Sequence, residues 1–436
     1  MGYQFSVRLL PSRYPIARAL TVAFFQRVFR IYFRRIEVVG LPGDQVKGRV
    51  FIANHVNGII DPALILCELP TMVSPLAKAP LFHMPGMAQL LAIADAVPVH
   101  RKRDDPTKKA DQNQGMFDSV GKHLAEGGNI LIFPEGTSHN EPFVIPIKSG
   151  AARMMASAAE QGGKGLTYQA IGLEFDAREA FRSRALLVGG PVRAIDALAL
   201  EGEPLVKTIT DGMREDLAEL IVEGVSWHDR ALVARVAELV SHDAGDFSLE
   251  GWNVVGRRVE AIRKTFVENE PIYERVSTSV TRYYAMLDAA GISDEALLRN
   301  GRTRGPVSYL LRLALLPLAF LAVPLYLVPY RLARLAYRLA GEEQDVVSTY
   351  KVAISLLAYP AWLAALLGLC LWLVPFPWSL IAASVVLTAP MAALPWLDWL
   401  DRHPLWRAEA PEHTALLAAR AQAVREISEA RIALGA

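Results

Sequence analysis

Residues 50–66 read VFIANHVNGIIDPALIL, and this stretch sets our expectation for the fold. An apolar run ends just before His55, a turn follows, and a second apolar run begins after Asp61-Pro62. The pattern predicts a strand, an exposed histidine, a turn and a helix. Asp followed by Pro is typical of a helix start, so we expect Asp61 to be the N-cap residue and to point back toward His55.

A carboxylate beside an imidazole orients the ring, selects its tautomer and raises its basicity. The pair His55 and Asp61 is therefore a candidate general base with its orienting partner. The alternative is a surface turn that holds an incidental histidine and a capping aspartate. Other stretches of the chain favour the catalytic interpretation.

Short β-rich runs alternate with helical stretches from about residue 36 to residue 194. The strand candidates are residues 49–53, 72–77, 96–99, 129–133, 168–175 and 185–188, and the helix candidates include 62–67, 84–94, 108–125 and 149–161. Such alternation predicts an α/β domain with a largely parallel sheet. Chemistry in such sheets lies in loops beyond the strand ends, and His55, Arg101 and Glu135 each follow a predicted strand.

A basic loop follows the strand candidate at 96–99, in the sequence AVPVHRKRDDPTKK at residues 96–109. The planar fork of Arg101 suits a phosphate or a carboxylate. The alternative is a solvated loop whose charge is balanced by Asp104 and Asp105.

Residues 129–139, NILIFPEGTSH, predict an apolar strand that stops at Pro134 and continues into a turn. Gly136 permits a close backbone approach there, and Glu135 can accept hydrogen bonds from substrate hydroxyls or orient a cation. An ordinary turn after a strand is the alternative.

Residues 144–155, VIPIKSGAARMM, place Lys148 at the start of a predicted helix. Exposed N–H groups, the helix dipole and a lysine together make an anion site, and the alternative is a plain N-cap at Ser149.

The segments NHVNGIIDP, VPVHR and FPEGTS, in this order, resemble the first three motifs of the glycerophospholipid acyltransferase superfamily, over about residues 33–192. Most members have four residues between the histidine and the aspartate, whereas five separate His55 from Asp61. This spacing, with KSG at 148–150 and GLEF…FRSRALLVGGP at 172–191, is most similar to the glycerol-3-phosphate/dihydroxyacetone-phosphate acyltransferases of fungi.

The resemblance implies a glycerol-phosphate-acyltransferase-like sheet with flanking helices, and His55 and Asp61 as catalytic residues. It also implies contacts to the substrates from a larger set, namely Arg101, Glu135, Gly136, Thr137, Lys148, Arg182 and Arg184. The last two arginines have an alternative role as solvated residues that flank a strand. The expected donor is an acyl thioester, on acyl-CoA or acyl carrier protein, and the expected acceptor is a phosphorylated glycerol.

The sequence has neither a nucleophile elbow nor a recognisable set of metal ligands, so we expect direct acyl transfer without a metal or a cofactor. Lysophosphatidate is the alternative acceptor. Two other classes stay open, a non-catalytic lipid-binding membrane protein on the same scaffold and a soluble hydrolase. Intact histidine and FPEGT elements argue against the first, and the missing elbow argues against the second.

The chain has 436 residues, a formal net charge of +1 and two cysteines. The near-neutral charge argues against general nucleic-acid binding. Two cysteines, Cys67 and Cys370, form no disulfide framework, which is typical of a reduced, cytosolic protein face.

We expect residues 1–35 to form a basic amphipathic helix at a membrane surface. Phe25, Val28, Phe29 and Tyr32 share the face that we expect in lipid, with arginines on the opposite face. A helix packed on its own domain is the alternative. Residues 195–305 are charged and helical, and we expect them to pack on the catalytic domain at 36–194.

Residues 306–398 predict a membrane region. The runs 352–374 and 376–397 lack charge and are long enough to cross a hydrocarbon core, so we expect a transmembrane hairpin. Arg331, Arg334, Arg338 and Lys351 favour the cytosolic side for the stretch before it. We therefore interpret 307–330 as re-entrant or interfacial, 399–436 as a cytosolic helix, and the catalytic domain as lying at the cytosolic face of the bilayer.

Overall fold

The computed structural model describes residues 13–99, 111–268, 270–299, 306–340, 344–402 and 410–433. The chain divides into two compact units, Met1–Trp227 and His228–Ala436. The boundary differs from the one expected at 194/195, because the sheet-containing unit continues for another helix. We describe each unit by itself.

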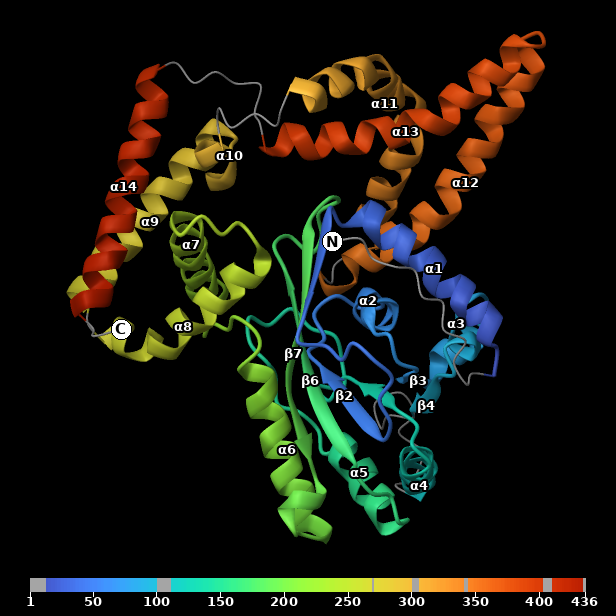
Figure 1. The fold of residues 1–436 in the computed structure, drawn as a ribbon, viewed down its shortest axis with the longest axis vertical. Coiled ribbons are helices and arrows are strands. Elements are labelled where there is room, and N and C mark those ends of the chain that lie inside the picture. Colours follow the sequence, from blue (N-terminus) through green and yellow to red (C-terminus); the bar gives the residue numbers. More distant parts are fainter. Residues whose placement is uncertain are drawn as a thin grey trace. The chain divides into compact units, whose positions relative to one another are not determined.

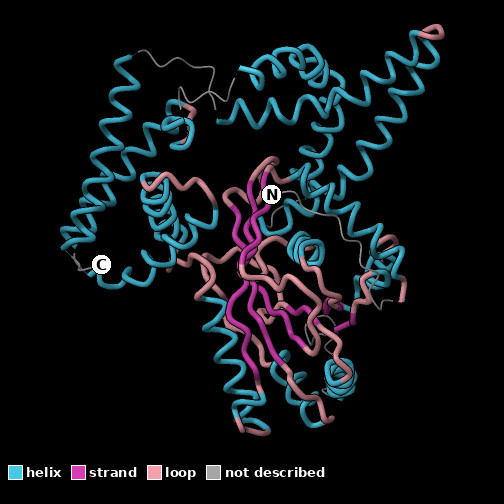
Figure 2. The backbone as a smooth tube through the Cα atoms, in the orientation of Figure 1, coloured by secondary structure: helices cyan, strands magenta, loops and turns pink. Residues whose placement is uncertain are grey.

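The first unit is built on a seven-stranded sheet with the order β1-β7-β6-β2-β5-β3-β4 (Figures 1 and 2). The strands are β1 (Arg35–Val39), β2 (Arg49–Ala53), β3 (Ser74–Lys78), β4 (Val97–Val99), β5 (Ile130–Ile132), β6 (Thr167–Phe175) and β7 (Arg184–Ala194). Every neighbouring pair is parallel except β6 and β7. The predicted α/β fold with a largely parallel sheet is therefore confirmed.

The central strand β2 explains why the sequence at 50–53 is wholly apolar. Val50, Phe51, Ile52 and Ala53 are each 0% exposed, as is usual for a parallel strand covered on both faces. The edge strand β1 was not predicted, because its sequence RIEVV contains two charged residues and only a short apolar run.

Helices flank the sheet, as expected (Figure 1). They are α2 (Ile60–Glu68), α3 (Met87–Ile93), α4 (Asp111–Ala125), α5 (Gly150–Glu160) and α6 (Gly202–Ala218), with the 3-10 turns η1 (Ala79–His83) and η2 (Asp196–Leu198). Helix α5 buries a row of small and flexible side chains, including Ala151, Met155 and Ala158, and lies against β2 and α6. Helix α6 also contacts β6 and β7, which is why the first unit extends past residue 194.

The N-terminal helix α1 (Pro15–Tyr32) presents a different face from the one predicted. Phe29 and Tyr32, expected in lipid, are 1% and 7% exposed and lie in a series of ring contacts that continues through Phe33 to Phe175. The expectation that this aromatic face enters lipid is therefore wrong. The exposed apolar residues of α1 include Ile16, Leu20 and Phe24.

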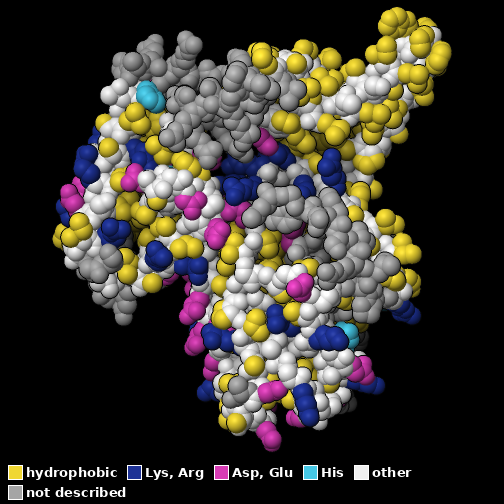
Figure 3. Space-filling model, in the orientation of Figure 1, with side chains coloured by type: hydrophobic (Ala, Val, Ile, Leu, Met, Phe, Trp, Pro, Cys, Tyr) yellow, Lys and Arg dark blue, Asp and Glu magenta, His cyan; other side chains and the backbone are white. Residues whose placement is uncertain are grey.

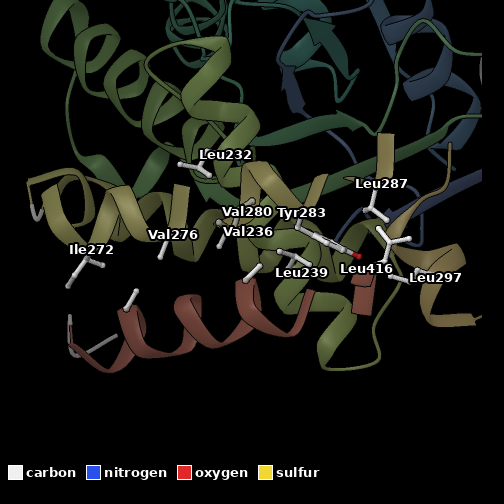
Figure 4. Close-up of a cluster of buried hydrophobic side chains, with 12 residues drawn as sticks. Leu232, Val236, Leu239, Ile272, Val276, Val280, Tyr283, Leu287, Leu297 and Leu416 are labelled. Carbon is white, nitrogen blue, oxygen red and sulfur yellow. The ribbon is translucent and has the colours of Figure 1, made fainter. Parts of the chain in front are cut away.

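The second unit contains the helices α7 (Trp227–Asp243), α8 (Leu249–Glu268), α9 (Glu270–Ala290), α10 (Asp294–Arg299) and α14 (Ala410–Ala433). Figure 4 shows their shared core, in which side chains of α7, α9, α10 and α14 interdigitate. The C-terminal helix α14 is thus held by α9 and its neighbours, a contact that was not predicted from the sequence.

A buried polar group lies beside this core. Asp294 accepts hydrogen bonds from His242 Nδ1 at 2.7 Å, from the hydroxyl of Tyr283 and from Arg420 Nε at 3.0 Å. Arg420 also pairs with Asp243 at 3.1 Å. These bonds join α7, α9, α10 and α14 around one carboxylate.

Within the described residues of the second unit, three helices are long and apolar enough to cross a membrane, namely α11 (Pro306–Ala340), α12 (Val347–Leu373) and α13 (Trp378–Arg402). The 3-10 turn η3 (Gln344–Val346) lies between the first two. Hydrophobic side chains cover the α12–α13 hairpin in Figure 3. The predicted C-terminal region of long apolar helices is confirmed, and by length and composition these helices could span a membrane. Helix α11, however, is one continuous helix, bent in Figure 1, with Pro317, Pro324 and Pro329 inside it.

Side chains from neighbouring helices satisfy two carbonyl groups that prolines leave without a partner. Pro329 has no N–H to offer Leu325, whose carbonyl oxygen accepts a hydrogen bond from Trp362 Nε1 of α12 at 2.6 Å. Pro390 likewise has no N–H to offer the carbonyl of Val386 in α13. That carbonyl oxygen accepts a hydrogen bond from the hydroxyl of Tyr326 at 2.8 Å. Helix α11 is thereby bonded to both arms of the hairpin.

Candidate active site

The turn that follows β2 holds a histidine and a buried carboxylate together. His55 Nδ1 lies 3.0 Å from Asp61 Oδ2, and the side chains are 14% and 0% exposed. The same carboxylate oxygen accepts hydrogen bonds from the backbone N–H groups of Val56 at 2.8 Å and Asn57 at 2.7 Å. Since an ionised aspartate only accepts, His55 Nδ1 carries the proton and Nε2 is left as the basic nitrogen.

Asp61 does not cap the helix, contrary to the prediction. Helix α2 begins at Ile60, with Ile59 as its N-cap residue, so Asp61 and Pro62 lie inside the first turn. The carboxylate is instead used by His55 and by the two N–H groups that precede the helix. The turn is closed by these bonds, which is how five intervening residues still bring Asp61 to the imidazole.

Two neighbouring groups fix the histidine from other directions. The ring of Phe133 stacks on the imidazole, with ring centroids 4.2 Å apart. Asn54, which is 2% exposed, donates to the carbonyl of Leu173 at 3.1 Å and accepts from its N–H at 2.7 Å. The side chain of Asn54 therefore extends the β2–β6 pairing up to the residue before His55.

Glu135 meets the histidine turn because β5 is the parallel neighbour of β2, so that both strands end at the same edge of the sheet. Its Oε2 accepts from the backbone N–H of His55 at 2.6 Å, and its Oε1 lies 2.9 Å from His139 Nε2. The Glu135 side chain is 0% exposed. Its predicted contact to substrate stays a prediction, and in the structure its carboxylate supports the backbone of His55.

Gly136 and Lys148 lie against each other at the next turn. Gly136 has φ of +78°, a conformation that favours glycine, and a Cβ placed there would lie 2.3 Å from Lys148 Nζ. The N–H of Lys148 donates to the carbonyl of Pro134 at 2.8 Å, which places the residue beside the FPEGT turn. Thr137 Oγ1 donates to the carbonyl of Ser138 at 3.2 Å.

Arg182 and Arg184 lie at the start of β7, which runs antiparallel to β6 and so begins at the edge where β2 and β6 end. Arg182 Nη1 donates to the carbonyls of Arg30 and Ile31 at 2.9 Å each, and Arg184 Nε pairs with Asp176 at 2.8 Å. Both guanidinium groups thus have structural partners, and their predicted phosphate contacts stay predictions. Arg101 lies outside the described residues, two positions after β4.

Two further residues of this site had no role in the sequence analysis. Arg178 donates to the carbonyl of Val56 at 2.9 Å and to Asn140, and its guanidinium lies over the ring of Trp227. No sequence signal marks Arg178. His139, by contrast, directly follows FPEGTS, and its position in the motif could have drawn attention to it.

Among the residues that the structure describes, no group of three or more His, Cys, Asp or Glu side chains could hold a metal ion. What the arrangement offers is one basic nitrogen, at His55, on a backbone that is held on several sides. Such a group can accept a proton from a hydroxyl.

An acyltransferase family model matches residues 35–171, which span β1 to most of β6 and contain His55, Asp61 and the FPEGT turn. An uncharacterized acyltransferase of Schizosaccharomyces pombe is 22% identical over 265 residues, which are 55% of this chain and 39% of the relative. Glycerol-3-phosphate O-acyltransferase 2 of Saccharomyces cerevisiae is 39% identical over 85 residues, or 19% of this chain and 11% of that protein.

A human lysophospholipid acyltransferase, LPCAT4, is 30% identical over 127 residues, which are 28% of this chain and 22% of that protein. The chain therefore spans less than half the length of each of these three relatives. The similarity of this chain to these relatives supports an acyltransferase segment and covers at most 55% of the chain.

Proposed function

We propose, since this chain belongs to the glycerophospholipid acyltransferase superfamily, that it transfers a fatty acyl chain from an acyl thioester to glycerol 3-phosphate or dihydroxyacetone phosphate. The observation that carries the proposal is the pair His55–Asp61 at 3.0 Å, in a closed turn at the carboxyl edge of the sheet. The aspartate fixes the tautomer that leaves His55 Nε2 as the base, and Nε2 belongs to a partly exposed side chain.

In the proposed reaction, His55 Nε2 takes the proton of the acceptor hydroxyl while the hydroxyl oxygen attacks the thioester carbonyl carbon. The tetrahedral intermediate then collapses, its C–S bond breaks, and the thiolate takes the proton from His55 to leave as a thiol. Asp61 stabilises the imidazolium that forms between these steps. General-base assistance of this kind contributes on the order of 10²–10⁴ in rate.

Lys148 and Arg101 are the proposed ligands of the acceptor phosphate. The Lys148 ammonium lies over Gly136, one residue from Glu135, and the described structure gives it neither a hydrogen bond nor an ion pair. An ammonium so placed can neutralise a phosphate held near His55. Gly136 and Thr137 would then line the place of the acceptor.

Lysophosphatidate or another lysophospholipid is the second candidate acceptor. The similarity to the human lysophospholipid acyltransferase favours it, because that match is longer than the match to the yeast glycerol-3-phosphate enzyme although its identity is lower. Both acceptors present a hydroxyl and a phosphate, so the same residues would serve either reaction.

We place the reaction at the cytosolic surface of a membrane. The three apolar helices of the second unit support membrane association, and the arginines at 331, 334 and 338 support a cytosolic position for the end of α11. The lipid product would stay in the bilayer.

The test is product identification with the full chain in lipid nanodiscs. Labelled acyl-CoA and, separately, acyl carrier protein loaded with the same chain are offered with glycerol 3-phosphate, dihydroxyacetone phosphate or lysophosphatidate. We expect His55-dependent transfer to at least one of the first two. Transfer to lysophosphatidate alone would favour the second candidate, and a wild-type chain that acylates none of the three would contradict the function.

A further inference from the structure

His139 forms, with Glu135, a closed ring of hydrogen bonds around the backbone of His55. The N–H of His55 donates to Glu135 Oε2 at 2.6 Å, and Glu135 Oε1 lies 2.9 Å from His139 Nε2. The backbone N–H of His139 in turn donates to the carbonyl of His55 at 3.1 Å. Both polar backbone groups of His55 are therefore held by the same two residues.

The protonation of His139 follows from its partners. The N–H of Glu141 donates to His139 Nδ1 at 3.1 Å, so Nδ1 is an acceptor and the proton is on Nε2. Nε2–H then donates to Glu135, and the neutral imidazole satisfies both neighbours at once. Because both ring nitrogens are used, the orientation of the ring is fixed.

The environment of the His139 side chain excludes a direct contact between its imidazole and the substrate. The side chains of His139 and Glu135 are 9% and 0% exposed, and their polar atoms point at each other and at the protein backbone. His139 is therefore not a second base for the substrate. Any effect that it has on the reaction passes through the position of His55.

We infer that His139 is a positioning residue for acyl transfer, which holds Glu135 so that the His55 backbone and the attached imidazole keep their reactive placement. The inference rests on the proposed function, in which His55 is the base. Misplacement of a catalytic group by about 1 Å can cost on the order of 10² in rate without any loss of substrate contacts. Loss of the His139–Glu135 bond should thus lower kcat and leave KM for both substrates nearly unchanged.

Two polar substitutions separate the two ring nitrogens. His139→Asn keeps an amide oxygen near the place of Nδ1, which can accept from Glu141, but has nothing that reaches Glu135. His139→Gln has an amide nitrogen near the place of Nε2 and can still donate to Glu135. We expect kcat to fall about 10- to 100-fold in His139→Asn and to recover most of that loss in His139→Gln.

Glu135→Gln tests the same bond at its acceptor. The substitution replaces one carboxylate oxygen by an NH₂ group, so the side chain can accept from only one of its two donors, the His55 N–H and His139 Nε2–H. We expect a fall in kcat comparable to that of His139→Asn. The double variant Glu135→Gln/His139→Asn should have a kcat little lower than that of either single variant, because all three variants lose the same hydrogen bond between residues 135 and 139. Glu141→Ala is the matched control. It removes an exposed side chain of the same loop and keeps the N–H that contacts His139.

Hydrogen exchange at the His55 amide gives a readout that does not depend on turnover. Its N–H is bound to Glu135, so exchange should speed up in His139→Asn and not in His139→Gln or Glu141→Ala, with thermal unfolding midpoints that stay close together. Exchange and kcat that are equal in the Asn and Gln variants would overturn the inference. A wild-type chain with no transfer activity but with this exchange pattern would contradict the proposed function and leave the role of His139 in holding His55 supported.

Discussion

Asp61 reaches the imidazole of His55 across five intervening residues, with 3.0 Å between Oδ2 and Nδ1. The same oxygen collects the N–H groups of Val56 and Asn57, so one buried atom closes the turn and orients the ring. A spacing of five residues is thus compatible with a direct contact between the carboxylate and the imidazole.

The first prediction concerns this pair. His55→Ala should lower turnover by at least about 10²-fold, because the base is lost. It should also reduce the free energy of unfolding by about 1–3 kcal/mol, because the imidazole is only 14% exposed and its loss removes one hydrogen bond from the buried Asp61 carboxylate. Asp61→Asn should also lower turnover, and it should reduce the free energy of unfolding by about 1–3 kcal/mol, because a buried acceptor of several hydrogen bonds is replaced. Turnover is measured with labelled donor and stability by calorimetry. Near-normal turnover in His55→Ala would refute the mechanism.

The second prediction concerns Gly136 and Lys148. Lys148→Ala should raise KM for the phosphorylated acceptor by about 10- to 100-fold, as expected for loss of a charge-assisted bond, and change KM for the donor little. Gly136→Ala should act in the same direction, because its Cβ would displace the Lys148 ammonium and because φ is +78° there.

Lys164→Ala is the control for the lysine. Lys164 is an exposed residue just before β6, at the edge of the sheet opposite to His55. If its substitution changed KM for the acceptor as much as that of Lys148, general electrostatic attraction would explain the effect better than a specific ligand.

The third prediction tests Arg101. Arg101→Ala should raise KM for the acceptor, and Arg101→Lys should recover only part of the loss, since lysine lacks the bidentate fork. Saturation curves for the acceptor that are the same in wild type and both variants would exclude Arg101 as a phosphate ligand. His100, Lys102 and Arg103 would then be tested in turn.

Much of the first unit could be predicted from local pattern. The apolar runs at β2 and β5 marked two strands, and the parallel geometry of α/β sheets then implied that His55 and Glu135 end at one edge. What local pattern could not supply were contacts that depend on the packed structure. The ring around His55 needs His139 to fold back on a residue more than eighty positions earlier, and nothing in either segment encodes that distance.

The N-terminal helix shows a second limit. Helix α1 has one apolar row through Phe25, Phe29 and Tyr32 and another through Ile16, Leu20 and Phe24, and helical periodicity alone does not say which row is buried. The ring contacts of Phe33 with Phe175 and of Tyr32 with Phe181 favour the first row, and they involve partners that are distant in the sequence.

The fourth prediction concerns Asp294 in the second unit. Burial by itself raises the pKa of Asp294, but hydrogen bonds from His242 and Tyr283 and the charge of Arg420 lower it by more, so the net pKa lies below its ordinary value of 3.8. A lowered pKa means that the ionised carboxylate stabilises the fold above about pH 4, and that this stability is lost as the pH falls through 3.8 and below. Asp294→Asn should remove this part of the acid sensitivity.

Arg420→Met tests the same group through its cation. Removal of one member of a buried ion pair costs about 3–5 kcal/mol, so we expect a lower unfolding midpoint and faster hydrogen exchange in α14. Arg425→Met, an exposed residue of the same helix, should change neither. Equal midpoints for the two variants would show that the buried pair contributes nothing.

The fifth prediction concerns the path of α11 through the membrane. Trp362 lies eleven residues before the end of α12 and Val386 eight residues after the start of α13, which are about 16 Å and 12 Å from the hairpin tip. In a hairpin that spans a 30 Å hydrocarbon core, their bonds to Leu325 and Tyr326 would place the middle of α11 at about half the depth of that core. An interfacial helix would not reach that depth.

The prolines of α11 lie near this deepest point, where a bend allows both ends of the helix to return to one side. We therefore expect residues 340 and 410 on the cytosolic side and the hairpin tip outside. Single cysteines at 340, 376 and 410, in a chain without Cys67 and Cys370, are exposed to a membrane-impermeant thiol reagent in intact cells, and permeabilised cells control for reactivity. Label at 376 alone is expected. Label at 340 and not at 376 would mean that α11 crosses the bilayer once, because the hairpin tip would then return to the side of the catalytic domain.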